Sequence, residues 1–307
     1  MRSFFIAILS FFLPAIGFSQ AKTTAKKTSP PAQKLANTVL WEITGKDLKT
    51  PSYLFGTMHI LCAQDAKLSD TLQAAIDKSE VVFFEVDMDN TAELMGLFKF
   101  IRMKDNKKLS DLMTAEEYER VKTYFSKNRS ILPLSMMERF KPYFIASMLS
   151  ESKMPCETKN GMEEVIMQEV KKQKKPINGL ESIAFQASVF DSIPYTEQAK
   201  ELLQTIDSAD KEDSSTLRML EVYRSQDLGA IEELTAHEEG LSAYLDLFLY
   251  HRNAKWIPVI EEAIRKSPTL IAVGAAHLPG NKGLIQLLVK AGYQLRPMKH
   301  SIHQKTM

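Results

Sequence analysis

Two copies of one short pattern carry the residue types best suited to chemistry. Each copy is an apolar run followed by glycine, two residues and histidine: SYLFGTMH ends at His59, and TLIAVGAAH ends at His277. Apolar runs of this length predict short buried strands, and glycine lets the backbone turn where a ligand or another segment comes close. Ligands of α/β sheets bind at strand ends. The pattern therefore predicts two imidazoles at a ligand-binding edge.

A carboxylate in a third apolar run completes a candidate metal site. Imidazole binds divalent transition metals, and a carboxylate commonly joins it in the ligand set. Glu85 lies in the run VVFFEV, where an unpaired charge would be costly to bury. We therefore expect His59, Glu85 and His277 to bind a divalent metal such as Mn, Co or Zn. The alternative for Glu85 is an ion pair with a buried arginine, for which Arg252 is the candidate.

Two more charged residues have candidate catalytic roles. Glu181 follows the short run PINGL, and the next residue, Ser182, is the better helix cap. This leaves Glu181 free to act as a general base. Arg252 lies in LYHRNAKW, and a guanidinium can grip a carboxylate or stabilise an oxyanion. The structural alternative for Arg252 is an ion pair with Asp246 or with Glu181.

The rest of the pattern predicts an α/β domain. Strands are expected at 39–44, 52–55, 81–86, 176–180, 269–273 and 293–298. Segments of helical periodicity separate most of them, which favours parallel strands with helical crossovers. A helical insertion is expected from Asn90 to Leu149 and a further helix from Trp256 to Lys266. We predict one α/β domain over residues 38–299, with a mainly parallel central sheet, flanking helices and a helical insertion.

The N-terminal residues have the pattern of a targeting segment. Residues 1–19 contain the positive Arg2, an apolar stretch and small residues before Gln20, which predicts a cleaved signal peptide. The apolar stretch is short for a membrane-spanning helix, and an uncleaved anchor is the alternative. Residues 20–37 are rich in Lys, Thr and Pro and predict a flexible linker. The mature protein is expected to be exported, periplasmic or secreted, with no stable membrane anchor.

The four remaining histidines are not expected at the site. His237 and His251 lie in Glu-rich or polar helical stretches and are interpreted as surface residues. Residues 300–307 are interpreted as a tail, in which His300 and His303 have no packing pattern.

Charge and cysteine content indicate which partners and which redox environment to expect. Thirty-nine Lys and Arg against 38 Asp and Glu give a net charge of +1, which argues against a nucleic-acid partner because such proteins need a basic patch. Cys62 and Cys156 are the two cysteines, and in an exported protein an even pair predicts a disulfide. The alternatives are that Cys62 is a soft metal ligand beside His59, or that both are buried thiols.

The ordered set of motifs resembles the TraB/GumN family, which includes the Tiki-type metalloproteases. The resemblance runs from LWEITGKDLKTPSYLFGTMHI through VVFFEVD, PINGLESIAFQ and LYHRNAKW to VGAAHLPGNKGLIQLLVKAGYQL. It implies metal-dependent hydrolysis and a fold like that of the erythromycin esterases and haem-binding lipoproteins.

The resemblance also implies which residues surround the pocket. It places the metal on His59, Glu85 and His277, with Glu181, Arg252 and Asn253 around them. Glu163 departs from the family pattern, which has Asp after the glycine. Because one more methylene moves the carboxylate, Glu163 is left out of the predicted site.

The predicted function is therefore metal-dependent hydrolysis of a peptide or amide bond, with a peptide or small molecule as substrate. In this prediction Glu181 transfers the proton and Arg252 stabilises the oxyanion. Two alternatives stay open: a protein that binds haem or iron without turnover, and a metal-free hydrolase in which a histidine is the general base.

Overall fold

The computed structural model describes residues 35–90, 96, 99–128, 132–152, 154–208, 214–236 and 244–301. The predicted signal peptide, most of the predicted linker, His237 and His303 lie outside these residues. Thr38, at which the single domain is predicted to start, is buried, and the first strand begins two residues later.

A six-stranded sheet forms the centre of the fold, with the order β6-β4-β7-β2-β1-β8. Its strands are β1 (Leu40–Thr44), β2 (Ser52–Thr57), β4 (Val81–Val86), β6 (Ile177–Glu181), β7 (Thr269–Gly274) and β8 (Gln294–Pro297). The strands β6, β4, β7 and β2 are parallel, whereas β1 pairs antiparallel with both β2 and β8. The predicted mainly parallel sheet is confirmed, and β1 and β2 form an antiparallel hairpin at one side of it.

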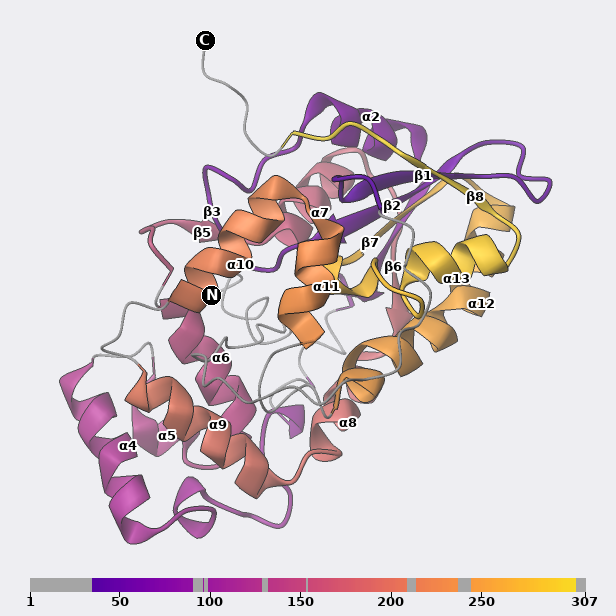
Figure 1. Cartoon of the computed structure of the whole chain (residues 1–307). Helices are drawn as coiled ribbons and strands as arrows, with labels where there is room; N and C mark the ends of the chain where they lie inside the picture. Colours follow the sequence, from indigo (N-terminus) through magenta and orange to yellow (C-terminus); the bar gives the residue numbers. More distant parts are fainter. Residues whose placement is uncertain are drawn as a thin grey trace, which may run out of the picture.

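Helices cover both faces of the sheet. Successive side chains of a strand point to opposite faces, and every residue of β2 is buried, so both faces must be covered. Helices α2 (Asp70–Lys78) and α7 (Met162–Lys172) lie together and are linked by hydrogen bonds from Gln73 and Gln173. Helices α12 (His251–Lys266) and α13 (Leu284–Lys290) form the other pair. Figure 1 shows the two pairs on opposite sides of the strands.

The helices of the predicted insertion lie away from the sheet, at the lower left of Figure 1. They are α4 (Ala115–Lys127), α5 (Leu134–Met137) and α6 (Pro142–Ser152), and they pack with α8 (Ile183–Asp191) and α9 (Tyr195–Asp207), which follow β6. These helices share a second apolar core. Three further elements, α10 (Ser214–Ser225), α11 (Leu228–Ala236) and the π-helical turn η3 (Asp246–Tyr250), precede α12. No helix in the described ranges is both long and apolar enough to cross a membrane.

The predicted start of the helix at Trp256 is wrong, because α12 begins at His251 and Pro258 lies inside it. The buried face of α12 continues from Trp256 back through Arg252 at helical spacing. Polar residues on this buried face hid the period that apolar residues would have shown.

The predicted tail is also wrong at His300, which is buried with 8% of its surface exposed. Its Nδ1 lies 2.7 Å from the hydroxyl oxygen of Ser69, the residue that caps α2, and its ring packs edge-on against Phe55. Gln226 donates to its carbonyl oxygen. A single polar residue after the last strand has no periodicity, so this packing could not be predicted from the sequence. The surface placement of His251 is confirmed.

The burial of His300 makes stability depend on pH. Burial lowers the pKa of His300 from 6.5 to about 4, so the unfolded chain binds the proton more tightly. The contribution is fully present above pH 6.5 and is lost as the pH falls toward 4. We expect the free energy of unfolding to fall by up to ~3 kcal/mol more in the parent than in His300→Asn over this window. Denaturant titrations of both proteins at several pH values measure this, and equal pH dependence would contradict it.

The predicted disulfide between Cys62 and Cys156 is confirmed, with Cα atoms 5.7 Å apart. This bond excludes Cys62 as a metal ligand. It joins β3 (Leu61–Cys62) to the segment before β5 (Lys159–Asn160), and these two short strands pair with each other.

Removing this disulfide should destabilise the fold, because it closes a chain separation of 94 residues. We expect the variant Cys62→Ala/Cys156→Ala to lose about 2–4 kcal/mol in the free energy of unfolding, measured with denaturant. Parent protein held under reducing conditions is the matched control and should show a similar loss. Equal stability of the parent and the double variant would refute this expectation.

Candidate active site

The candidate site lies at the C-terminal ends of the parallel strands. His59 follows β2, Glu85 is the penultimate residue of β4, Glu181 ends β6, and His277 lies in the 3-10 turn η4 (Ala275–His277) after β7. Strand β7 is inserted between β2 and β4, so the chain order reverses here. Ligands of open α/β sheets bind at such a switch point. The predicted residues are thereby brought together.

His277 is held in one tautomer by Asn253. The Asn253 amide nitrogen donates to the carbonyl oxygens of His277 and Lys282, so its Oδ1 is the atom 2.6 Å from His277 Nδ1. An amide oxygen only accepts, hence Nδ1 carries the proton and Nε2 presents a lone pair. Burial lowers the pKa of His277 to about 3, which keeps the ring neutral.

His59 is held in the same way by Glu163, which the sequence analysis left out of the site. The His59 Nδ1 lies 2.6 Å from Glu163 Oε1, and the Thr57 hydroxyl donates to the same oxygen. Burial opposes protonation of His59, but the Glu163 charge and hydrogen bond outweigh it and raise the pKa of His59 to about 8.

A glycine permits the contact between His59 and Glu163. Gly161 caps α7, and a Cβ on Gly161 would collide with the His59 carbonyl oxygen. The extra methylene of Glu163 relative to Asp does not remove the carboxylate from the site, so leaving it out was wrong. The available signal was an acid in the first turn of a helix behind a glycine.

Arg252 connects the two remaining acids. Its Nη2 donates to Glu85 Oε2 at 2.7 Å and to Glu181 Oε1 at 2.6 Å, and its Nε donates to the same Glu181 oxygen at 2.9 Å. Trp256 Nε1 donates to the other Glu181 oxygen. The alternatives that paired Arg252 with Glu85 and with Glu181 are confirmed. The alternative with Asp246 is wrong, because Asp246 pairs with Lys282.

Glu85 accepts hydrogen bonds from Arg252, from the Gly274 backbone and from the Gln186 side chain. Burial raises the pKa of a carboxyl group, but the charges of Arg252 and the two histidines, with the Gly274 hydrogen bond, outweigh this and hold the pKa of Glu85 well below its usual range. In contrast, burial raises the pKa of Glu181.

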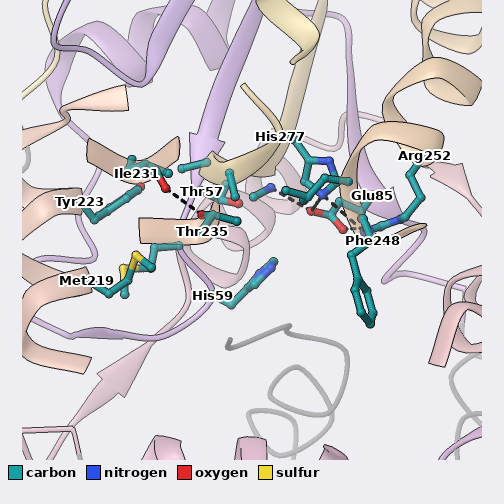
Figure 2. Close-up of a pocket in the computed structure, with 15 residues that line it drawn as sticks. Thr57, His59, Glu85, Met219, Tyr223, Ile231, Thr235, Phe248, Arg252 and His277 are labelled. Atoms are coloured by element: carbon teal, nitrogen blue, oxygen red, sulfur yellow. Dashed lines mark hydrogen bonds and ion pairs between the residues drawn. The ribbon is translucent and has the colours of Figure 1, made fainter. Parts of the chain in front are cut away.

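A cavity of about 110 Å³ opens at the site. Its polar side is formed by His59, Glu85, Arg252, His277 and the backbone at Gly274. Figure 2 shows the labelled side chain of His59 apart from the cluster of Glu85, His277 and Arg252. Glu181 and Asn253 do not line the cavity and contact it only through Arg252 and His277.

The donor types and tautomers at the cavity fit a divalent metal. Both imidazoles have Nδ1 held by an oxygen, which is the usual support of a metal-binding histidine. A Cβ added to Gly274 would lie 3.2 Å from Glu85 Oε1 and 3.6 Å from His59 Nε2, so these atoms face one space. His277 Nε2 is 3.6 Å from Glu85 Oε1. Within the described residues, no three His, Cys, Asp or Glu side chains are already grouped to hold a metal ion.

The chain belongs to the TraB/PrgY/gumN family, whose sequence pattern matches residues 39–297. It is 21% identical to Metalloprotease TIKI1 of Danio rerio, over 94% of this chain and 69% of that protein. It is 20% identical to Metalloprotease TIKI2 of Danio rerio (94% and 66%) and 22% identical to Metalloprotease TIKI1 of Homo sapiens (92% and 67%). The chain thus spans about two thirds of the length of these relatives. No solved structure matches the chain, so the predicted likeness to erythromycin esterases is not supported.

Loss of the Arg252 charge should destabilise the protein strongly. Its side chain is 2% exposed, and Arg252→Met would leave two buried carboxylates without their cation. We expect a loss of about 3–5 kcal/mol in the free energy of unfolding, measured with denaturant at pH 7. The control is Arg296→Met, which removes an ion pair to Glu42 from an arginine that is 68% exposed and should cost less than about 1 kcal/mol. Similar losses in the two variants would show that the buried ion pairs of Arg252 stabilise the fold no more than an exposed ion pair does.

Proposed function

We propose that this protein is a metal-dependent hydrolase of peptide or amide bonds. The observation that carries the proposal is the matched support of two imidazoles, with Nδ1 of His59 on Glu163 and Nδ1 of His277 on Asn253. His59, Glu85 and His277 would hold the metal. A divalent metal supplies a water of lowered pKa and polarises a carbonyl group. The names of the relatives support a peptide as the substrate.

The other residues of the site orient the histidines and stabilise charge. Asn253 keeps Nε2 of His277 unprotonated, and Glu163 fixes the ring of His59. Arg252 Nη1 lies 3.4 Å from His277 Nε2 at the cavity and is a permanent donor for negative charge that develops on the substrate. Both oxygens of Glu181 accept from Arg252 and Trp256. We therefore assign Glu181 to holding Arg252 rather than to transferring a proton.

One observation favours a second candidate, a metal-free hydrolase. Arg252 already neutralises Glu85, and a histidine oriented by a carboxylate is a common general base. In this mechanism His59 Nε2 would take a proton from water, and Glu163 would stabilise the resulting imidazolium. The haem alternative has no comparable support, because pockets for even drug-sized ligands are about 300 Å³ or more and this cavity is about 110 Å³.

Export is also part of the proposal. The disulfide between Cys62 and Cys156 supports it, because disulfides persist mainly in oxidising compartments. N-terminal sequencing of the protein recovered from outside the cytoplasm should begin at Gln20. An intact Met1 or Arg2 there would refute cleavage.

Metal removal and reloading test the hydrolase. The purified protein is treated with a chelator, reloaded separately with Mn, Co or Zn, and examined for bound metal and for cleavage of a peptide library by mass spectrometry. We expect one of these metals to bind near one equivalent per chain and to restore cleavage. His277→Ala should lose metal and activity, and Glu163→Gln should lower affinity or activity by about 10–100-fold, as loss of a ligand's support does.

The matched control is His251→Ala, which removes an exposed histidine at the start of α12 and should leave metal binding and cleavage unchanged. Cleavage that survives chelation but is lost in His59→Ala would favour the metal-free mechanism. Parent-like metal binding and parent-like cleavage in His277→Ala would refute the proposed site.

A further inference from the structure

The cavity has a second side of opposite character. Met219 and Tyr223 reach it from α10, and Ile231 and Thr235 reach it from α11. We call these four residues the apolar wall. Figure 2 shows them together at one end of the cavity, with Glu85, His277 and Arg252 at the other. A molecule that bridges the two ends meets charge at one and hydrocarbon at the other.

The hydroxyl groups of the apolar wall are already used within the protein. Thr235 donates to the carbonyl oxygen of Ile231 at 2.8 Å, and Tyr223 donates to the carbonyl oxygen of Gly56 at 3.0 Å. Neither hydroxyl therefore has a hydrogen to offer a ligand. A carboxylate placed against this wall would lose its water without a replacement donor, which is costly, whereas a hydrocarbon group gains from burial.

The size of the cavity limits what the wall can take. The whole cavity is about 110 Å³, smaller than a cavity of about 150 Å³ that holds benzene. An aliphatic side chain of the size of leucine or methionine is of the right order.

We propose that the apolar wall is a specificity subsite for one aliphatic side chain, so that the substrates are peptides with a leucine-like or methionine-like residue beside the bond that is cleaved. The inference rests on the proposed hydrolase and names its substrate class. Met219 is the residue of the wall that a substitution can enlarge, because its side chain lines the cavity and is only half-buried. In the described part of the chain, no hydrogen bond or ion pair joins Met219 to the charged residues at the polar end.

Binding measurements test the subsite without requiring turnover. The probes are N-acetyl amino-acid amides of leucine, methionine, alanine, glutamate and lysine, added to the protein labelled with ¹³C at its methionine methyl groups. The Met219 signal is identified by its loss in Met219→Leu. We expect this signal to shift with the leucine and methionine probes, which should bind about 10-fold or more tighter than the other three.

Three variants separate pocket filling from general damage. Met219→Trp fills the subsite and should weaken leucine-amide binding about 10-fold or more, whereas Met219→Leu keeps the volume and should stay within about threefold. Leu217→Trp adds the same ring on the same helix at an exposed position and should change nothing. For Met219→Trp and Leu217→Trp, binding is followed by isothermal calorimetry.

Failure of the proposed subsite and failure of the proposed hydrolase give different results. If the leucine probe binds selectively and Met219→Trp removes its binding while no peptide is cleaved, the subsite stands and the hydrolase fails. If peptides are cleaved but leucine is preferred over neither alanine nor glutamate, the subsite is overturned and the hydrolase stands. Equal binding of the leucine probe to the parent and to Met219→Trp would also overturn the subsite.

Discussion

The buried guanidinium of Arg252 is the interaction on which the rest of the site depends. It lies between carboxylates that end two neighbouring parallel strands, Glu85 on β4 and Glu181 on β6, and it belongs to the helix that covers them. Two ionised carboxylates so close together in a buried region would repel each other and would lack water. The positive charge of Arg252 therefore offsets the repulsion between the two carboxylates. Its guanidinium also makes a cation–π contact with the ring of Trp256, which helps to hold it in place.

The same region holds two histidines with opposite protonation behaviour. His59 faces the carboxylate of Glu163 and has a raised pKa, whereas His277 faces an amide oxygen and has a lowered pKa. Burial acts on both rings in the same direction, so the difference comes from the partner of Nδ1. The neutral ring of His277 can ligate a cation at once, whereas His59 can do so through Nε2 only after it has lost its proton.

The strands and the two histidines could be predicted from sequence because apolar runs and glycine breaks are local signals. Their meeting could not be predicted in detail. Strand β7 enters the sheet between β2 and β4, and this non-local pairing decides that His277 lies beside Glu85. Glu163 was missed for a related reason, since its contact with His59 depends on the close approach that Gly161 permits. His300 was missed because a single buried polar residue has no period, and its partner Ser69 lies far away in sequence.

The disulfide joins the chain segment that carries His59 to the segment that carries Glu163. Cys62 lies three residues after His59, and Cys156 precedes Gly161 and Glu163 on the other segment. Between the disulfide and the site, β3 pairs with β5, and the Met162 amide donates to the Met58 carbonyl oxygen. The two segments are therefore joined by a covalent bond, a strand pair and a backbone hydrogen bond before His59 meets Glu163. A pair of side chains that must exchange a proton or orient a ligand needs such support, because an error of about 1 Å in position can cost about 100-fold in rate.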